Sequence, residues 1–149
     1  MTRELLFNNS FEPQLAAFTT WKSLVAVQGA MPSTFAPSDH PGFEIIPGEA
    51  KYTAFDSFGH PTNGVQAFTV RMHFAHAQLS IAAMRATRAA DVSLVEEFFS
   101  GGYVPPAVLP GDTARIDGAQ LLKIDPPLLS KTATRSSIAA QAEYSFTLF

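Results

Sequence analysis

The residues best suited to chemistry in this chain are four histidines, and their spacing does not bring them together. His73 and His76 are three residues apart, which places them on opposite faces of a strand, so they cannot share a metal ion there. His40 and His60 each precede a proline, in segments predicted to be loops, where such residues are mostly part of turns. We therefore predict no metal site.

The carboxylates give no stronger signal for catalysis. Glu96 and Glu97 are adjacent, hence about 100° apart on a helix, and do not form a convergent acid-base pair. The chain has no nucleophile elbow, no phosphate-binding or dinucleotide-binding glycine motif and no zinc-protease motif. Gly101-Gly102 follows a predicted helix and is interpreted as its cap. Residues can still converge from distant positions, but no catalytic residue and no cofactor is predicted, and we expect a protein that is not an enzyme.

Composition points to a surface that another molecule covers. Hydrophobic residues make up 46% of the 149 residues and charged residues only 15%, whereas soluble domains carry about 25% charged residues. A permanent oligomer would cover the apolar surface that this implies. The alternative is a monomer whose surface consists of Ser, Thr, Gln and Ala.

Charge and cysteine content exclude several classes of protein. The net charge is −3, and lysines and arginines are scattered, which argues against an electrostatic nucleic-acid binder. The absence of cysteine excludes disulfides and a thiol nucleophile and fits a reducing cytoplasm. No run approaches the eighteen or so apolar residues of a membrane span. We therefore expect a soluble, unexported protein with no membrane partner.

The clearest secondary-structure pattern is strict alternation at the end of the sequence. From residue 141 to 148, apolar and polar residues alternate, a period typical of a half-buried strand. Residues 65–74 alternate in the same way. The two inward-facing sets are wholly apolar: Phe68, Val70, Met72, Phe74, Ala142, Tyr144, Phe146 and Leu148.

Helices are predicted at residues 11–28 and 77–99. Asn9 and Ser10 suit an N-cap before the first helix, although residues 19–27 could instead form a strand because they are rich in β-branched residues. In the second segment, the spacing of Ser93 and Glu96 matches a capping box, so this helix could break near Asp91.

The remaining elements complete an α+β fold in a single domain spanning residues 1–149. We expect a mainly antiparallel sheet with two helices packed on one face. The predicted strands are 43–46 and 49–55, or one strand broken at Pro47-Gly48. A loop with an Asn-Gly turn follows at 56–64, then a hairpin of 113–116 and 119–124 around Asp117-Gly118, and a crossing loop at 128–137.

Two long proline-rich loops, residues 30–41 and 103–111, are the candidate binding surfaces. Proline fixes φ and removes an amide donor, so neither a helix nor a strand ladder runs through them, and a stiff loop loses little entropy on binding. The first loop could equally fold back as a lid over its own core. The predicted contact residues are Met31, Phe35, Tyr103, Val104, Val108 and Leu109.

In its order of elements the chain resembles the tail terminator proteins of long-tailed bacteriophages. The likeness rests on the first helix, the strand at 65–74, the helix at 77–99 and the closing strand at 141–148. It implies a ring, of six subunits, that caps the tail tube and joins it to the head connector. Other tail or connector proteins would be its partners, DNA would pass through without sequence-specific binding, and the protein would reside in the virion and, during assembly, in the host cytoplasm.

A second class of function remains open. Helices on a curved antiparallel sheet also form the cone of small ligand-binding or isomerase-type domains, with a pocket lined by the inward aromatic and aliphatic residues of the two best strands. Such an enzyme needs an ionisable group among its inward residues. The predicted inward sets are apolar, which favours a packed core. A tube subunit or another head-tail joining subunit would differ from a terminator mainly in its neighbours.

Overall fold

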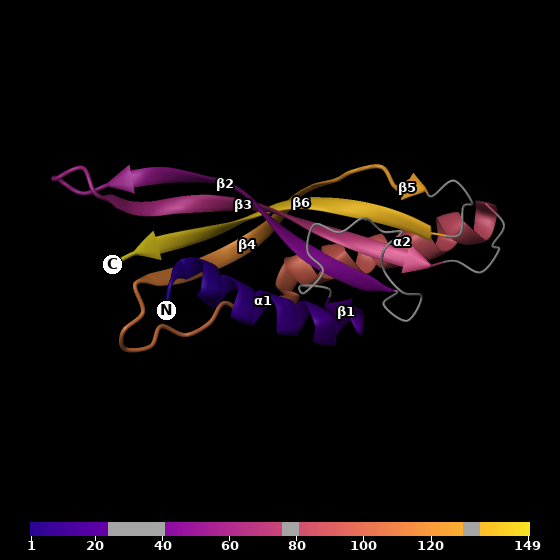
Figure 1. The fold of residues 1–149 in the computed structure, drawn as a ribbon, viewed down its shortest axis with the longest axis horizontal. Coiled ribbons are helices and arrows are strands. Elements are labelled where there is room, and N and C mark those ends of the chain that lie inside the picture. The colour runs from indigo at the N-terminus through magenta and orange to yellow at the C-terminus, as the bar shows by residue number, and fades with distance from the viewer. Residues whose placement is uncertain (24–40, 76–80, 130–134) are drawn as a thin grey trace.

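A computed structural model describes residues 1–23, 41–75, 81–129 and 135–149. It shows a twisted sheet with helices packed on it (Figure 1), which confirms the predicted α+β class. The strand order is β1-β2-β3-β6-β4, β5 pairs with β6, and every pairing except β1 with β2 is antiparallel. The elements are α1 (Arg3–Thr19), β1 (Lys22–Ser23), β2 (Gly42–Phe55), β3 (Pro61–Ala75), α2 (Ile81–Glu97), η4 (Phe98–Gly102), β4 (Ala114–Ile124), β5 (Leu128–Leu129) and β6 (Arg135–Leu148).

Strand β6 lies in the middle of the sheet, as its alternating sequence predicts for a paired strand. It pairs with β3 without a register shift, from Asn63 opposite Thr147 to Ala75 opposite Arg135. Phe68 lies opposite Ala142 and therefore on the same face, and both side chains are buried. One face of the sheet thus carries the core, as the two apolar sets require.

Helix α1 begins at Arg3, earlier than the predicted start near residue 11. Phe7, Phe11 and Leu15 recur every four residues and are fully or almost fully buried, so the apolar stripe of the helix begins before the expected cap. The Ser10 hydroxyl does not cap a helix start, because it donates backwards to the Phe7 carbonyl at 3.0 Å. Pro13 therefore lies inside the helix and not in its first turn.

Helix α1 also ends earlier than predicted, at Thr19. Thr20 adopts a left-handed conformation with φ 63°, which a helix cannot continue through. The Thr19 hydroxyl donates to the Leu15 carbonyl and accepts from the Trp21 amide, at 2.7 and 3.2 Å. Lys22–Ser23 then form a short strand, as the competing interpretation of residues 19–27 predicted, and this strand pairs in parallel with β2. Residues 24–40, which include Val25 and the first proline-rich loop except Pro41, lie outside the described residues.

Helix α2 runs from Ile81 to Glu97 without the break predicted near Asp91. The capping-box interpretation of Ser93 and Glu96 is therefore wrong, because both residues lie within continuous helix. The helix continues into the wider turn of η4, and Gly101 at φ 151° ends it as predicted. Phe98 of η4 is fully buried against Phe11, which fixes the end of α2 on the same sheet face as α1.

Two predicted turns lie within strands instead. Asn63 and Gly64 belong to β3, and the β2–β3 turn lies before them, around Gly59 with φ 82°. Gly64 serves close packing, because a Cβ there would lie 2.6 Å from both the Lys51 carbonyl oxygen and a ring carbon of Phe146.

Asp117-Gly118, expected to be a hairpin turn, lies at a bulge within β4. The register against β6 shifts between Ile116 and Gly118. The Asp117 carboxylate accepts hydrogen bonds from Arg115 at 2.7 Å and from the Thr147 hydroxyl at 2.8 Å, so it holds the bulge against the neighbouring strand. The predicted crossing loop at 128–137 contains strand instead, since β5 pairs with the start of β6.

Strand β2 is a single strand whose pairing with β3 is irregular between Pro47 and Ala50. This matches the second predicted arrangement, one strand interrupted at Pro47-Gly48. Gln66 satisfies the polar groups there. Its side-chain amide donates to the Gly48 carbonyl at 2.6 Å, and its oxygen accepts from Arg3 at 2.9 Å. Burying a glutamine side chain without such partners would cost free energy of folding. Gln66 therefore links Arg3 to the irregular part of β2.

The close approach at Gly64 gives a test of the fold. Gly64→Ala should lower the free energy of unfolding by about 1–3 kcal/mol, since backbone and a buried ring must move to admit the methyl group. Gly118→Ala is the matched control, because no atom lies within 4 Å of its added Cβ, and it should change stability by less than about 0.5 kcal/mol. Urea denaturation measures both, and equal midpoints for the two variants would contradict the packing argument.

Candidate functional site

The second proline-rich loop starts from a residue that is packed against helix α1. The hydroxyls of Tyr103 and Ser10 lie 2.9 Å apart, and the Tyr103 ring contacts those of Phe7, Phe11 and Phe98. Burial raises the pKa of the Tyr103 hydroxyl. The structure therefore places this predicted contact residue on its own core, from which it positions the rest of the loop.

The next residues of the loop turn apolar side chains to solvent although their backbone is held. Val104 exchanges two 2.8 Å hydrogen bonds with the Gln14 side chain of α1, one from its amide and one to its carbonyl. The Leu109 amide donates to Asp112 at 2.8 Å. The side chains of Val104 and Leu109 are nevertheless 65% and 64% exposed, and Val108 is exposed as well. This loop is a pre-ordered apolar surface, as a docking element requires.

Both ends of the described chain lie beside this loop. The Met1 ammonium lies 3.3 Å from the Asp112 carboxylate, and the Thr113 carbonyl accepts from the Phe149 amide at 3.1 Å. The backbone hydrogen bond from Leu109, together with that ammonium, lowers the pKa of Asp112. Met1 and Phe149 are exposed and apolar. We call the set Met1, Val104, Val108, Leu109 and Phe149 the loop surface.

A second exposed apolar feature, which the sequence interpretation missed, is the turn between β2 and β3. Phe58 is 84% exposed and Phe55 is 59% exposed. The Asp56 carboxylate accepts from the amides of Phe58 and His60 at 2.8 and 2.9 Å, which fixes the turn. We call Phe55 and Phe58 the hairpin tip. The available signal was an aromatic residue in a tight turn, where polar residues are usual.

The two remaining predicted contact residues, Met31 and Phe35, lie outside the described residues. The structure therefore brings together three of the predicted residues, Val104, Val108 and Leu109, on one exposed loop, with Tyr103 beneath them.

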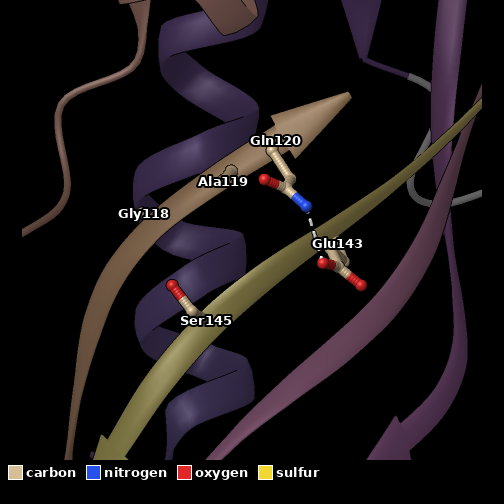
Figure 2. A pocket seen from close by; sticks show the side chains of 5 residues that line it. All are labelled: Gly118, Ala119, Gln120, Glu143 and Ser145. Carbon is tan, nitrogen blue, oxygen red and sulfur yellow. Dashed lines mark hydrogen bonds between the residues drawn. The ribbon is translucent and has the colours of Figure 1, made fainter. Parts of the chain in front are cut away.

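A hollow of about 220 Å³ lies on the polar face of the sheet. Figure 2 shows Gln120, Glu143 and Ser145 on the side of the sheet away from α1. Gln120 donates to the Glu143 carboxylate at 2.8 Å. The lining has one carboxylate and no histidine, and among the described residues Ser145 has no base as a side-chain partner. This arrangement suits a hydrogen-bonded sheet surface and not nucleophilic or acid-base catalysis.

The residues that would line the pocket of a ligand-binding cone are instead packed. Phe7 of α1 lies flat on Tyr144, with ring centroids 4.0 Å apart, and it also contacts Phe68. What remains between α1 and β2–β3 is a cleft of about 100 Å³, far below the roughly 300 Å³ at which ligand pockets begin. Glu12 lies beside it, and desolvation raises its pKa.

One buried ionisable pair was not predicted. The side chains of Glu44 and His73 are fully buried, with Glu44 Oε1 3.5 Å from His73 Nε2. Strand pairing places both on the opposite face of the sheet from Phe43 and Met72. His73 faces away from the apolar set, as predicted, and the pair lies outside the core that a cone-shaped pocket would occupy. Full burial makes it unsuited to meeting a substrate.

Two negative findings concern the described ranges. No group of three or more His, Cys, Asp or Glu residues there is arranged to hold a metal ion. No helix in the same ranges is long and apolar enough to cross a membrane.

Comparison with known proteins bears on the fold. No protein-family model and no curated protein matches the sequence. A chain in the structure of the virion of a native gene transfer agent particle superposes with a TM-score of 0.51 at 16% identity, covering 94% of this chain and 93% of that one. The two chains share a fold. A second solved structure gives the same TM-score at 12% identity, covering 98% of this chain and 94% of that one.

Asp91 provides a test of the electrostatics of α2. Burial raises the pKa of its carboxyl to about 6, above the ordinary 3.8, so the fold favours the protonated form. The stabilisation contributed by the protonated Asp91 carboxyl is therefore fully present below pH 3.8, and it is lost as the pH rises through 6. Asp91→Asn mimics the neutral form and should raise the Tm at pH 7.5 by on the order of 4 °C, with the gain shrinking toward pH 4. Glu96→Gln, at an exposed position of the same helix, is the control. A pH-independent gain for Asp91→Asn would refute this assignment.

Proposed function

We propose that this protein is a structural subunit of a phage-like virion, working as a tail terminator or a related head-tail or tail-tube joining subunit in a ring. The observation that carries the proposal is the superposition, over nearly the full length of both chains, on a chain of a gene transfer agent virion. The order of elements that resembles tail terminators is present in the fold: α1, the β2–β3 pair, α2 and the closing β6.

The loop surface supports a role in assembly. Its apolar side chains are exposed while hydrogen bonds to Gln14, Asp112 and Thr113 fix its backbone. Ordering such a surface before contact reduces the entropic cost of association. In the proposed ring, Val104, Val108 and Leu109 lie against a neighbouring subunit or an adjoining virion protein, with Tyr103 supporting them from the core. Met31 and Phe35 are proposed as further contacts.

The described side chains suit a packed, structural protein better than an enzyme. The apolar face of the sheet is filled by the rings of α1, and the polar hollow holds a single carboxylate among hydrogen-bonded neighbours. The proposed mechanism is therefore geometric. Each subunit, acting as one domain, presents two different surfaces to its neighbours, and a heterologous contact of this kind closes by rotation into a ring.

The proposed ring, of six subunits, caps the tail and leaves a passage for DNA. The net charge of −3 disfavours retention of DNA on its phosphates. Its partners are further copies of itself and neighbouring tail or connector proteins. Its place is the virion and, during assembly, the host cytoplasm.

The native mass tests this proposal. Light scattering after size exclusion, over a concentration series, should show a species several times the 16.1 kDa chain mass, and electron microscopy should show rings. Val104→Asp and Leu109→Asp should each raise the concentration needed for association at least about tenfold, because each places a charge within an apolar contact.

Leu128→Asp is the matched control, since Leu128 is 71% exposed on β5 at the far end of the molecule (Figure 1). It should leave the mass unchanged. A compact monomer at every concentration, with no rings in the micrographs, would contradict the proposed function. Equal effects of all three substitutions would contradict the role of the loop.

A further inference from the structure

The hairpin tip is the most exposed aromatic feature of the described chain. Phe58 at 84% and Phe55 at 59% extend beyond the core, while Tyr52, nearer the body, still contacts the Phe146 ring. Figure 1 shows the β2–β3 hairpin projecting beyond the other strands. Aromatic side chains contribute most to protein interfaces when they are buried there, and this pair is not covered by the described part of its own chain.

The turn holds its aromatic residues in place. Asp56 accepts from two amides through its carboxylate, its own amide donates to the His60 carbonyl at 2.9 Å, and the Gly59 amide donates to the Asp56 carbonyl at 3.1 Å. His60 Nδ1 lies 3.3 Å from the same carboxylate, and the Phe58 ring lies beside the imidazole. The one acidic charge of the turn is therefore already engaged, and the turn presents its two phenylalanine rings on a hydrogen-bonded scaffold.

The loop surface is chemically suited to receive this tip. No charged residue occurs from residue 98 to residue 111, and the segment contains three prolines. An aromatic ring placed against Val104, Val108 and Leu109 would meet uncharged side chains. The nearby Met1 ammonium and Asp112 carboxylate are already paired with each other at 3.3 Å. The exposed groups of Val104, Val108 and Leu109 are aliphatic, so contact with phenyl rings removes apolar area from water on both sides.

The topology places the two surfaces on opposite edges of one sheet. The order β2-β3-β6-β4 puts the hairpin at one edge, and the loop leads into β4 at the other. Figure 1 shows the turn and the loop at the same end of the molecule, on different sides of it. One chain cannot bring its own two edges together across β3 and β6. A second copy, rotated beside the first, can place its β2–β3 edge against the β4 edge of the first.

We infer that the hairpin tip of one copy, Phe55 and Phe58, inserts into the loop surface of the next copy at Val104, Val108 and Leu109. The site is complete only when the second copy contributes its two aromatic residues. The contact joins different surfaces and is therefore heterologous, so it repeats around a ring. The inference rests on the proposed ring, because it names the contact that closes it.

The absence of cysteine from the sequence allows a direct test by disulfide cross-linking. Two full-length variants, Phe58→Cys and Leu109→Cys, are mixed and oxidised with diamide, and the products are separated by non-reducing electrophoresis. A hetero-dimer should form between the two variants. A chain carrying both substitutions should give a ladder that ends at the size of the ring. Phe58→Cys mixed with Leu128→Cys is the control and should give no hetero-dimer.

The outcomes separate the contact from the proposed function. A hetero-dimer with Leu109→Cys but not with Leu128→Cys supports the inference. Homo-dimers of Phe58→Cys alone overturn it in favour of a two-fold contact between tips. Rings that form without cross-links, and that form equally well from Phe58→Asp, overturn the inference and leave the proposed function standing. A protein that stays monomeric and uncross-linked overturns both.

A second measurement does not depend on the orientation of two thiols, because it uses no cross-link. Phe58→Asp should raise the concentration of half-association at least about tenfold, while its thermal unfolding as a monomer stays unchanged because Phe58 is exposed. Leu128→Asp, at 71% exposure and outside both the hairpin tip and the loop surface, is the matched control. Equal association by Phe58→Asp and the unaltered chain would overturn the inference.

Discussion

The aromatic packing between α1 and the sheet is the constraint on which the other features depend. Four long strands present one apolar face that must be covered, and Phe7 and Phe11 cover it by contacting Tyr144 and Phe68 with ring centroids 4.0 and 5.2 Å apart. This contact fixes where α1 lies. The helix in turn positions Ser10 and Gln14, whose side chains hold the start of the apolar loop. The exposed surface thus depends on the buried one.

Strong periodicity made part of this fold predictable. Strands β3 and β6 have a buried face and a solvated face, so every second residue reports its side of the sheet. The first helix was misplaced because local capping chemistry at Asn9 and Ser10 competed with a longer apolar stripe beginning at Phe7. Asn63-Gly64 and Asp117-Gly118 were interpreted as turns for a related reason. The same dipeptides also serve close packing and bulges, and only the neighbouring strand decides between these roles.

The candidate surface was predictable in one part and not in the other. Prolines and aliphatic residues identified the loop that carries Val104, Val108 and Leu109, because proline excludes both helix and ladder. The hairpin tip was not identified, since the predicted turn lay several residues too late and Phe58, within the predicted loop at 56–64, was not considered as a contact residue. The buried partners Glu44 and His73 could not be found from alternation on one strand, because their proximity comes from the pairing of β2 with β3.

The uninterrupted pairing of β3 with β6 has a mechanical consequence. Hydrogen bonds of an antiparallel pair lie perpendicular to the strands, and this register runs without a bulge from Asn63 and Thr147 to Ala75 and Arg135. A pull along the strands loads all these bonds in shear at once, whereas a pull across them opens the bonds one after another. The long direction of the sheet is therefore its stiff direction. A protein under tension or pressure resists best when its strands are aligned along the load.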